Sequence, residues 1–151
     1  FLLQHWDRTR EVAGVFKELM AGGVFAVGTV FFVAEQAQFS WATLMAMGAW
    51  GGLCAMNCVV LAWWDRELDA AMRQPSLSRC CPDARRWLWP GVLGVMMLAV
   101  GAWALDARLA PLAGALWVST LALGEVGRSE ASDGRRVLAD AVLLAPVLFW
   151  L

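Results

Sequence analysis

The sequence has few charged residues for its length, and this shortage excludes two classes of protein. Of its 151 residues 17% are charged, 12 Lys and Arg against 13 Asp and Glu, whereas 60% are hydrophobic. A soluble chain usually carries about 25% charged residues, and a nucleic-acid-binding protein has basic patches that this sequence lacks. We therefore expect neither a water-soluble globule nor a nucleic acid partner.

The sequence also has few residues suited to a zinc site. The chain has one His, His5, and four cysteines, of which Cys54 and Cys58 lie four apart and Cys80 and Cys81 are adjacent. Neither pair has C-x-x-C spacing, and one His cannot complete a zinc site of the usual type. We interpret the cysteines as packing residues, and the sequence leaves a redox role for the adjacent pair open.

A secretory signal peptide is missing as well. The first ten residues mix charged and apolar types, without a basic segment followed by an apolar core and a cleavage site. The chain begins at Phe1 rather than Met and ends within an apolar run. We expect it to be a fragment of a larger membrane protein, with an N-terminal half missing.

Long uncharged runs are what the sequence has in abundance. A helix needs about 20 residues, with a range of about 17–25, to cross the hydrocarbon of a bilayer. Continuous rather than alternating apolar runs favour helices over membrane strands. The sequence predicts an all-α integral membrane protein, one membrane domain over residues 1–151 built as a bundle of about five transmembrane helices. The expected spans are 15–34, 41–64, 87–105, 109–124 and 137–151.

The basic residues outside these spans predict an orientation. Counted from the N-terminal segment through the four connections, Lys and Arg number 3, 0, 5, 1 and 3. This alternation is what the positive-inside rule requires of successive crossings. We therefore expect a multi-pass protein of the cell inner membrane, with the loops at 65–86 and 125–136 in the cytoplasm.

Tryptophan and glycine add detail to the expected spans. Most of the ten Trp residues fall near span ends, where aromatic residues meet the membrane interface. Trp50 and Trp117 lie in mid-span and could face lipid or a ligand cavity. Gly48 and Gly52 form a G-x-x-x-G pattern, which predicts close helix packing on the second span.

One short segment has residues suited to chemistry. The second expected span runs directly into Asp65-Arg66-Glu67-Leu68-Asp69. If the helix continues, Asp65 and Asp69 project one turn apart on one face and could share a Mg²⁺ ion with substrate phosphates. Arg66 and Arg73 could then bind a diphosphate. The alternative is a solvated helix boundary in which these arginines pair with the acids.

The segment MNCVVLAWWDRELD resembles an aspartate-rich motif of the UbiA superfamily of intramembrane prenyltransferases. In that family two such motifs, N-D-x-x-D-x-x-x-D and D-x-x-x-D, bind Mg²⁺ and an isoprenoid diphosphate on the cytoplasmic side. Leu61 and Ala62 stand where the first motif has Asn and Asp, so Asp65 and Asp69 resemble the second motif. Segments 17–29 and 135–148 also resemble a bacterial branch of the family.

This resemblance implies a fold and an activity. The chain would correspond to helices five to nine of nine, the C-terminal half, and would transfer an isoprenoid group from its diphosphate to a lipophilic acceptor with Mg²⁺. Asp65 and Asp69 would be metal ligands, and Arg66 and Arg73 would contact the diphosphate. The alternative is a non-catalytic UbiA-like membrane scaffold or lipid-binding protein with decayed motifs.

Two further polar residues fall within the expected spans. Asn57 should face the bundle interior, where it would form a helix–helix hydrogen bond or contact the acceptor in the substrate cavity. Asp140 follows Arg136 by four residues, which predicts an ion pair within one helix.

Overall fold

The described residues of the computed structural model are 16, 20–28, 40–72, 81, 83–130 and 132–148, and every regular element among them is helical. Residues 20–28 form one helical segment. The other elements are the long helices α2 (Trp41–Trp64), α5 (Leu88–Leu105), α6 (Ala110–Arg128) and α7 (Asp133–Leu148), and the short helices α3 (Arg66–Ala71), η1 (Ala84–Trp87) and η2 (Ala107–Leu109). The expected all-α class is confirmed.

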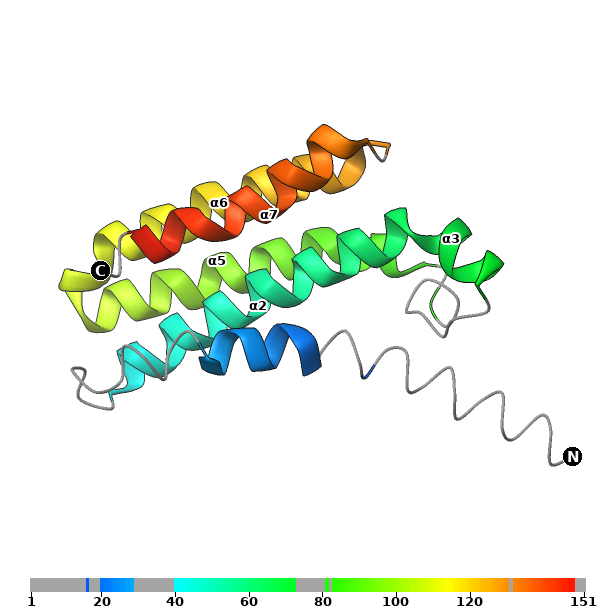
Figure 1. Cartoon of the computed structure of the whole chain (residues 1–151). Coiled ribbons are helices and arrows are strands. Elements are labelled where there is room, and N and C mark those ends of the chain that lie inside the picture. The colour runs from blue at the N-terminus through cyan, green and yellow to red at the C-terminus, as the bar shows by residue number, and fades with distance from the viewer. Residues whose placement is uncertain are drawn as a thin grey trace, which may run out of the picture.

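The four long helices lie side by side, and each runs antiparallel to the one before it (Figure 1). α5 packs between α2 and α6, α7 packs on α6, and α7 also returns to contact α2. As a result the C-terminal ends of α2 and α6 lie near the N-terminal ends of α5 and α7. We call this end of the bundle, with residues 63–69, 83–89, 125–130 and 132–140, the polar end.

Three helical segments are long and apolar enough to cross a membrane: Trp41–Trp64, Arg85–Leu105 and Ala107–Arg128. They match three of the five expected spans. Half of the expected span 15–34 lies outside the described residues, and the span 137–151 runs past Leu148, the last described residue. These two spans stay predictions.

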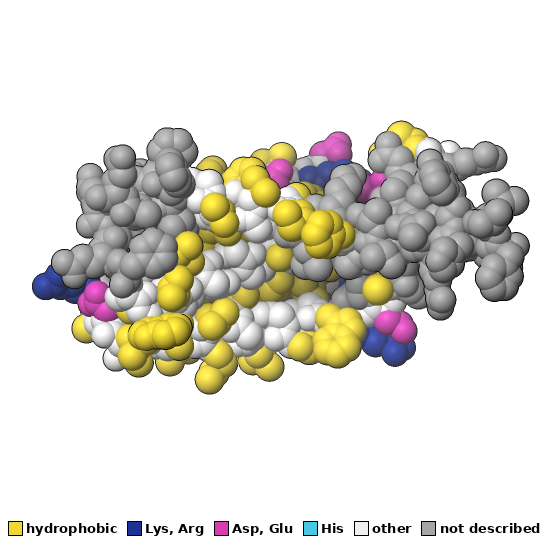
Figure 2. Space-filling model, turned by 90° about the horizontal axis from the view of Figure 1, so that it is seen from below, with side chains coloured by type: hydrophobic (Ala, Val, Ile, Leu, Met, Phe, Trp, Pro, Cys, Tyr) yellow, Lys and Arg dark blue, Asp and Glu magenta, His cyan; other side chains and the backbone are white. Residues whose placement is uncertain are grey.

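The surface of the bundle is suited to lipid. On α5, Leu93 is 60% exposed and Met97 is 70% exposed, without a charged residue anywhere in the helix. Along the lower edge of Figure 2, hydrophobic side chains cover the middle of the molecule, and charged side chains lie toward its two ends. An exposed apolar band of this kind marks a membrane protein.

The expected close packing on the G-x-x-x-G pattern is confirmed. A Cβ atom added to Gly52 would lie 2.7 Å from Cγ2 of Val95, so α5 approaches α2 too closely there for any side chain. On the adjacent face, a Cβ at Gly51 would lie 3.2 Å from Cβ of Ala26. Small residues on α2 thus allow close packing of α5 on one side and of the helical segment 20–28 on the other.

We predict that Gly52→Ala lowers the free energy of unfolding by about 1–3 kcal/mol, because overpacking a filled interface costs that much and Val95 is stiff at χ1. Gly48→Ala is the matched control, since its Cβ would lie at an ordinary 3.5 Å from Leu98. Both variants share the same gain in helix propensity, so unfolding in mixed detergent micelles isolates the clash. Equal stability of the two variants would contradict the close approach.

Candidate functional site

The chain continues in helical geometry through the end of α2. The backbone N–H of Asp65 donates to the carbonyl of Leu61 at 2.9 Å, and that of Asp69 donates to the carbonyl of Asp65 at 2.8 Å. Asp65 and Asp69 are therefore one helical turn apart, as the metal hypothesis requires. The side chain of Asp65 is 30% exposed, so it lies at the margin of the bundle rather than within it.

Asp65 is paired with a residue from the other end of the sequence. Nη2 of Arg136, in the first turns of α7, lies 2.6 Å from Oδ1 of Asp65, an oxygen that the protein shields from solvent. The side chain of Arg136 itself is 39% exposed. The ion pair expected within α7, between Arg136 and Asp140, is wrong, because Arg136 reaches across to α2 instead.

Asp140 also contacts α2. Nδ2 of Asn57 donates to Oδ1 of Asp140 at 3.2 Å, and Asn57 is only 4% exposed. The helix–helix role expected for Asn57 is confirmed. Its Oδ1 is buried and has no hydrogen-bond partner among the described residues, so contact of Asn57 with an acceptor substrate stays a prediction.

Of the two arginines expected to bind diphosphate, the structure describes Arg66 alone. The guanidinium of Arg66 lies over the ring of Trp63, 4.8 Å from its centroid, and 3.9 Å from the carboxylate of Glu67. This stacking keeps the charge of Arg66 on an aromatic side chain of the preceding helical turn. Arg73 lies outside the described residues.

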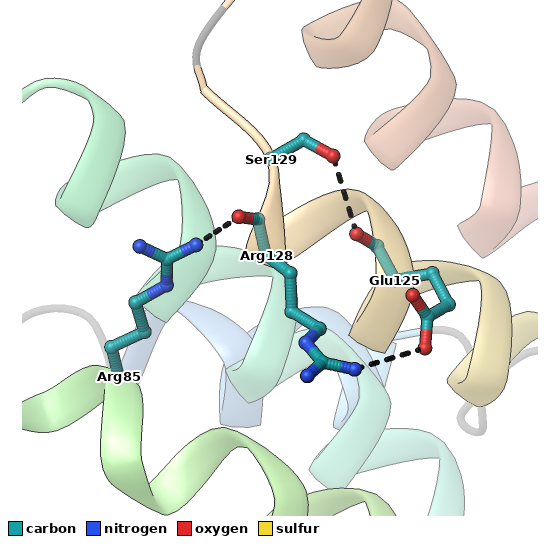
Figure 3. Close-up of polar contacts among 4 residues, drawn as sticks. All are labelled: Arg85, Glu125, Arg128 and Ser129. Atoms are coloured by element: carbon teal, nitrogen blue, oxygen red, sulfur yellow. Dashed lines mark hydrogen bonds and ion pairs between the residues drawn. The ribbon is translucent and has the colours of Figure 1, made fainter.

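The C-terminal end of α6 is tied to its neighbours at the polar end. A helix leaves its last carbonyls without partners, and here the guanidinium of Arg85 donates to the carbonyl of Arg128 (Figure 3). The indole N–H of Trp64 donates to the carbonyl of Ser129 at 3.2 Å. Arg128 also pairs with Glu125 at 3.5 Å. Positive groups at a helix C-terminus are favoured by the helix dipole, and these contacts hold α2, η1 and α6 together.

The donor set at Asp65 and Asp69 fits part of a magnesium site. Mg²⁺ is usually held by one or two carboxylates together with substrate phosphates, which two acids in successive turns could supply. Across the described part of the chain, no group of three His, Cys, Asp or Glu residues is placed to hold a metal. These residues thus suit a shared metal–phosphate site and do not form a complete cage.

The mid-span tryptophans have different surroundings. Trp50 is 2% exposed, and its indole N–H has no partner among the described residues. Trp117 is partly exposed and donates its indole N–H to the carbonyl of Met96 at 3.1 Å. Trp50 therefore faces the interior, whereas Trp117 joins α6 to α5.

Comparison with protein family models, with curated proteins and with solved structures gives no match for this chain. The resemblance to the UbiA superfamily therefore stays a prediction from the sequence.

We predict that Asn57 and Asp140 are energetically coupled across the bundle. Such hydrogen bonds in membrane proteins contribute about 0.6 kcal/mol on average and up to about 1.7 kcal/mol. A double-mutant cycle with Asn57→Ala and Asp140→Ala, followed by unfolding in mixed micelles, should give a coupling energy in that range. Strictly additive effects would show that the contact contributes nothing to stability.

Proposed function

We propose that this chain is the C-terminal half of a UbiA-like intramembrane prenyltransferase, which transfers an isoprenoid group from its diphosphate to a lipophilic acceptor. The observation that carries the proposal is the placement of Asp65 and Asp69 in successive helical turns at the end of a helix able to cross a membrane. An amphiphile with an apolar tail and a diphosphate head matches an apolar helix that ends in charged residues.

The roles of the residues follow from this placement. Asp65 and Asp69 would hold Mg²⁺, which supplies charge neutralisation for the departing diphosphate. In the transfer the allylic C–O bond breaks, its electron pair leaves with the diphosphate, and the acceptor forms the new bond and loses a proton. The uncharged faces of the long helices would receive the tail and exclude water from the allylic cation.

A second candidate function is a non-catalytic lipid-binding protein or scaffold of the same fold. The observation that favours it is the ion pair of Asp65 with Arg136, which already neutralises one of the two acids. The departures from the family pattern at Leu61 and Ala62 favour it as well. The two functions differ in whether Asp65 and Asp69 are needed for transfer.

We predict that Asp65→Ala and Asp69→Ala each lower Mg²⁺-dependent prenyl transfer by about 100-fold or more, because an electrostatic group at a reacting centre contributes about that much to the rate. The measurement is incorporation of labelled prenyl diphosphate into membrane lipid by the full-length protein. The acceptor comes from the native membrane extract.

Asp83→Ala is the matched control for this experiment. Asp83 is an exposed acid at the same end of the bundle and pairs with Arg86 at 3.3 Å, away from the successive acids. Its transfer rate should stay within about twofold of wild type, as is usual for an exposed surface site. Equal incorporation by all three variants would remove the assigned role from Asp65 and Asp69.

We also propose that the polar end faces the cytoplasm, in the bacterial inner membrane. Cys81 is exposed in the 65–86 connection and reports on this end. With Cys54, Cys58 and Cys80 replaced by Ala, Cys81 should react with a membrane-impermeant maleimide in inverted vesicles and stay unreacted in intact spheroplasts.

The opposite end of the bundle provides the control. Ala107 is exposed in η2, so Ala107→Cys in a chain without the native cysteines should show the reverse labelling. Reaction of Cys81 from the periplasmic side would contradict the orientation and with it the access of Asp65 to a cytoplasmic diphosphate.

A further inference from the structure

Among the described residues, the guanidinium that pairs with Asp65 is that of Arg136, in α7. It lies 2.6 Å from Asp65, whereas Arg66, the nearer residue in the sequence, has its charge over the ring of Trp63. Position along the chain therefore gives a misleading picture of which arginine borders the site. The pairing brings a residue about seventy positions away to the exit of α2.

The ion pair engages a single nitrogen of Arg136 with a single oxygen of Asp65. A guanidinium carries five N–H donors in a planar fork, which suits bidentate contact with phosphate oxygens. The side chain of Arg136 is 39% exposed, so it lies at the surface of the bundle. Its guanidinium has more donors than the single contact with Asp65 uses, and it can offer them to an anion.

The position of α7 does not depend on this ion pair alone. Asp140, one turn further along α7, accepts a hydrogen bond from the buried Asn57 of α2. Ala139 and Val142 of α7 are buried as well. The helix therefore has its own apolar and polar anchors, and the Arg136 side chain is available for a role other than holding α7.

We propose that Arg136 is a diphosphate-binding residue, which Asp65 holds at the site in the absence of ligand. This inference rests on the proposed function and extends it, since it assigns the diphosphate contact to α7 as well as to the loop after α2. A diphosphate brings more negative charge than the single carboxylate of Asp65, so the guanidinium turns toward it when it binds.

The test is equilibrium binding of inorganic pyrophosphate to the full-length protein in lipid nanodiscs, measured by calorimetry with and without Mg²⁺. Arg136→Gln should raise the Kd about tenfold or more in both conditions, because it removes a charge-assisted contact, and Arg136→Lys should lie between Arg136→Gln and wild type. Arg135→Gln is the matched control, because Arg135 is the exposed neighbour and its guanidinium donates to the carbonyl of Glu130 at 2.6 Å. The Kd of this variant for pyrophosphate should stay within about twofold of wild type.

A charge-swapped variant separates binding from structure. Asp65→Arg combined with Arg136→Asp restores an ion pair between α2 and α7, so thermal unfolding should stay close to wild type. The Kd for pyrophosphate should stay raised about tenfold or more, as in Arg136→Gln, with and without Mg²⁺, because the carboxylate and the guanidinium have exchanged places. Binding restored by the swap would show that Arg136 serves only to hold the helices, and would overturn the inference.

The remaining outcomes separate a failure of this inference from a failure of the proposed function. If wild type binds pyrophosphate and Arg136→Gln binds it equally well, or if Arg135→Gln loses as much, the inference fails while the proposed function stands. If wild type binds no pyrophosphate under either condition, the proposed function fails together with the inference.

Discussion

Lipid offers no hydrogen-bond partners, and this constraint organises the whole bundle. A charged side chain in a spanning helix has to lie near a helix end or to find a partner across the interior. The cores of α2, α5 and α6 accordingly carry no charge, and their charged residues gather where the helices begin and end. Asn57, a buried polar side chain of α2, finds its partner in Asp140 of α7.

The antiparallel order of the helices brings the charged residues at several helix ends together. With four helices alternating in direction, the exits of α2 and α6 and the starts of α5 and α7 come together at one end. Each helix exit leaves carbonyls that attract positive side chains, and Arg85 meets such carbonyls at the end of α6. The turn that follows α2 carries the acids Asp65 and Asp69, and a positive side chain from α7, Arg136, pairs with Asp65 there. A cluster of acids and arginines at the membrane edge follows from topology and composition together.

Local rules predicted the parts of this arrangement that lie within one helix. The lengths of the uncharged runs predicted three spans, the glycine spacing predicted close helix packing on α2, and the spacing of Asp65 and Asp69 predicted their placement one turn apart. The stacking of Arg66 on Trp63 was also within reach, since residues three apart are neighbours on a helix.

The contacts between helices could not be predicted in this way. Arg136 and Asp140 are four apart, and the rule for one helix pairs them with each other. In the structure α7 lies against α2, and each of the two finds a closer partner there. Which face of α7 meets α2 depends on how α7 packs on α6, and no spacing within α7 contains that information. A basic residue at the start of a span, on the same side as the acidic pair, was the available signal for Arg136.

The strength of the Asp65–Arg136 pair bears on what it is for. An ion pair between partly exposed groups contributes only about 0–1 kcal/mol to stability, and here both side chains retain solvent contact. The buried Ala139 and Val142 anchor α7 in any case. A contact so weak, between a carboxylate in metal-binding spacing and a guanidinium with free donors, is poorly suited to holding helices together and well suited to exchange. Both side chains are partly exposed at the margin of the bundle, where a charged headgroup from the membrane interface could reach them.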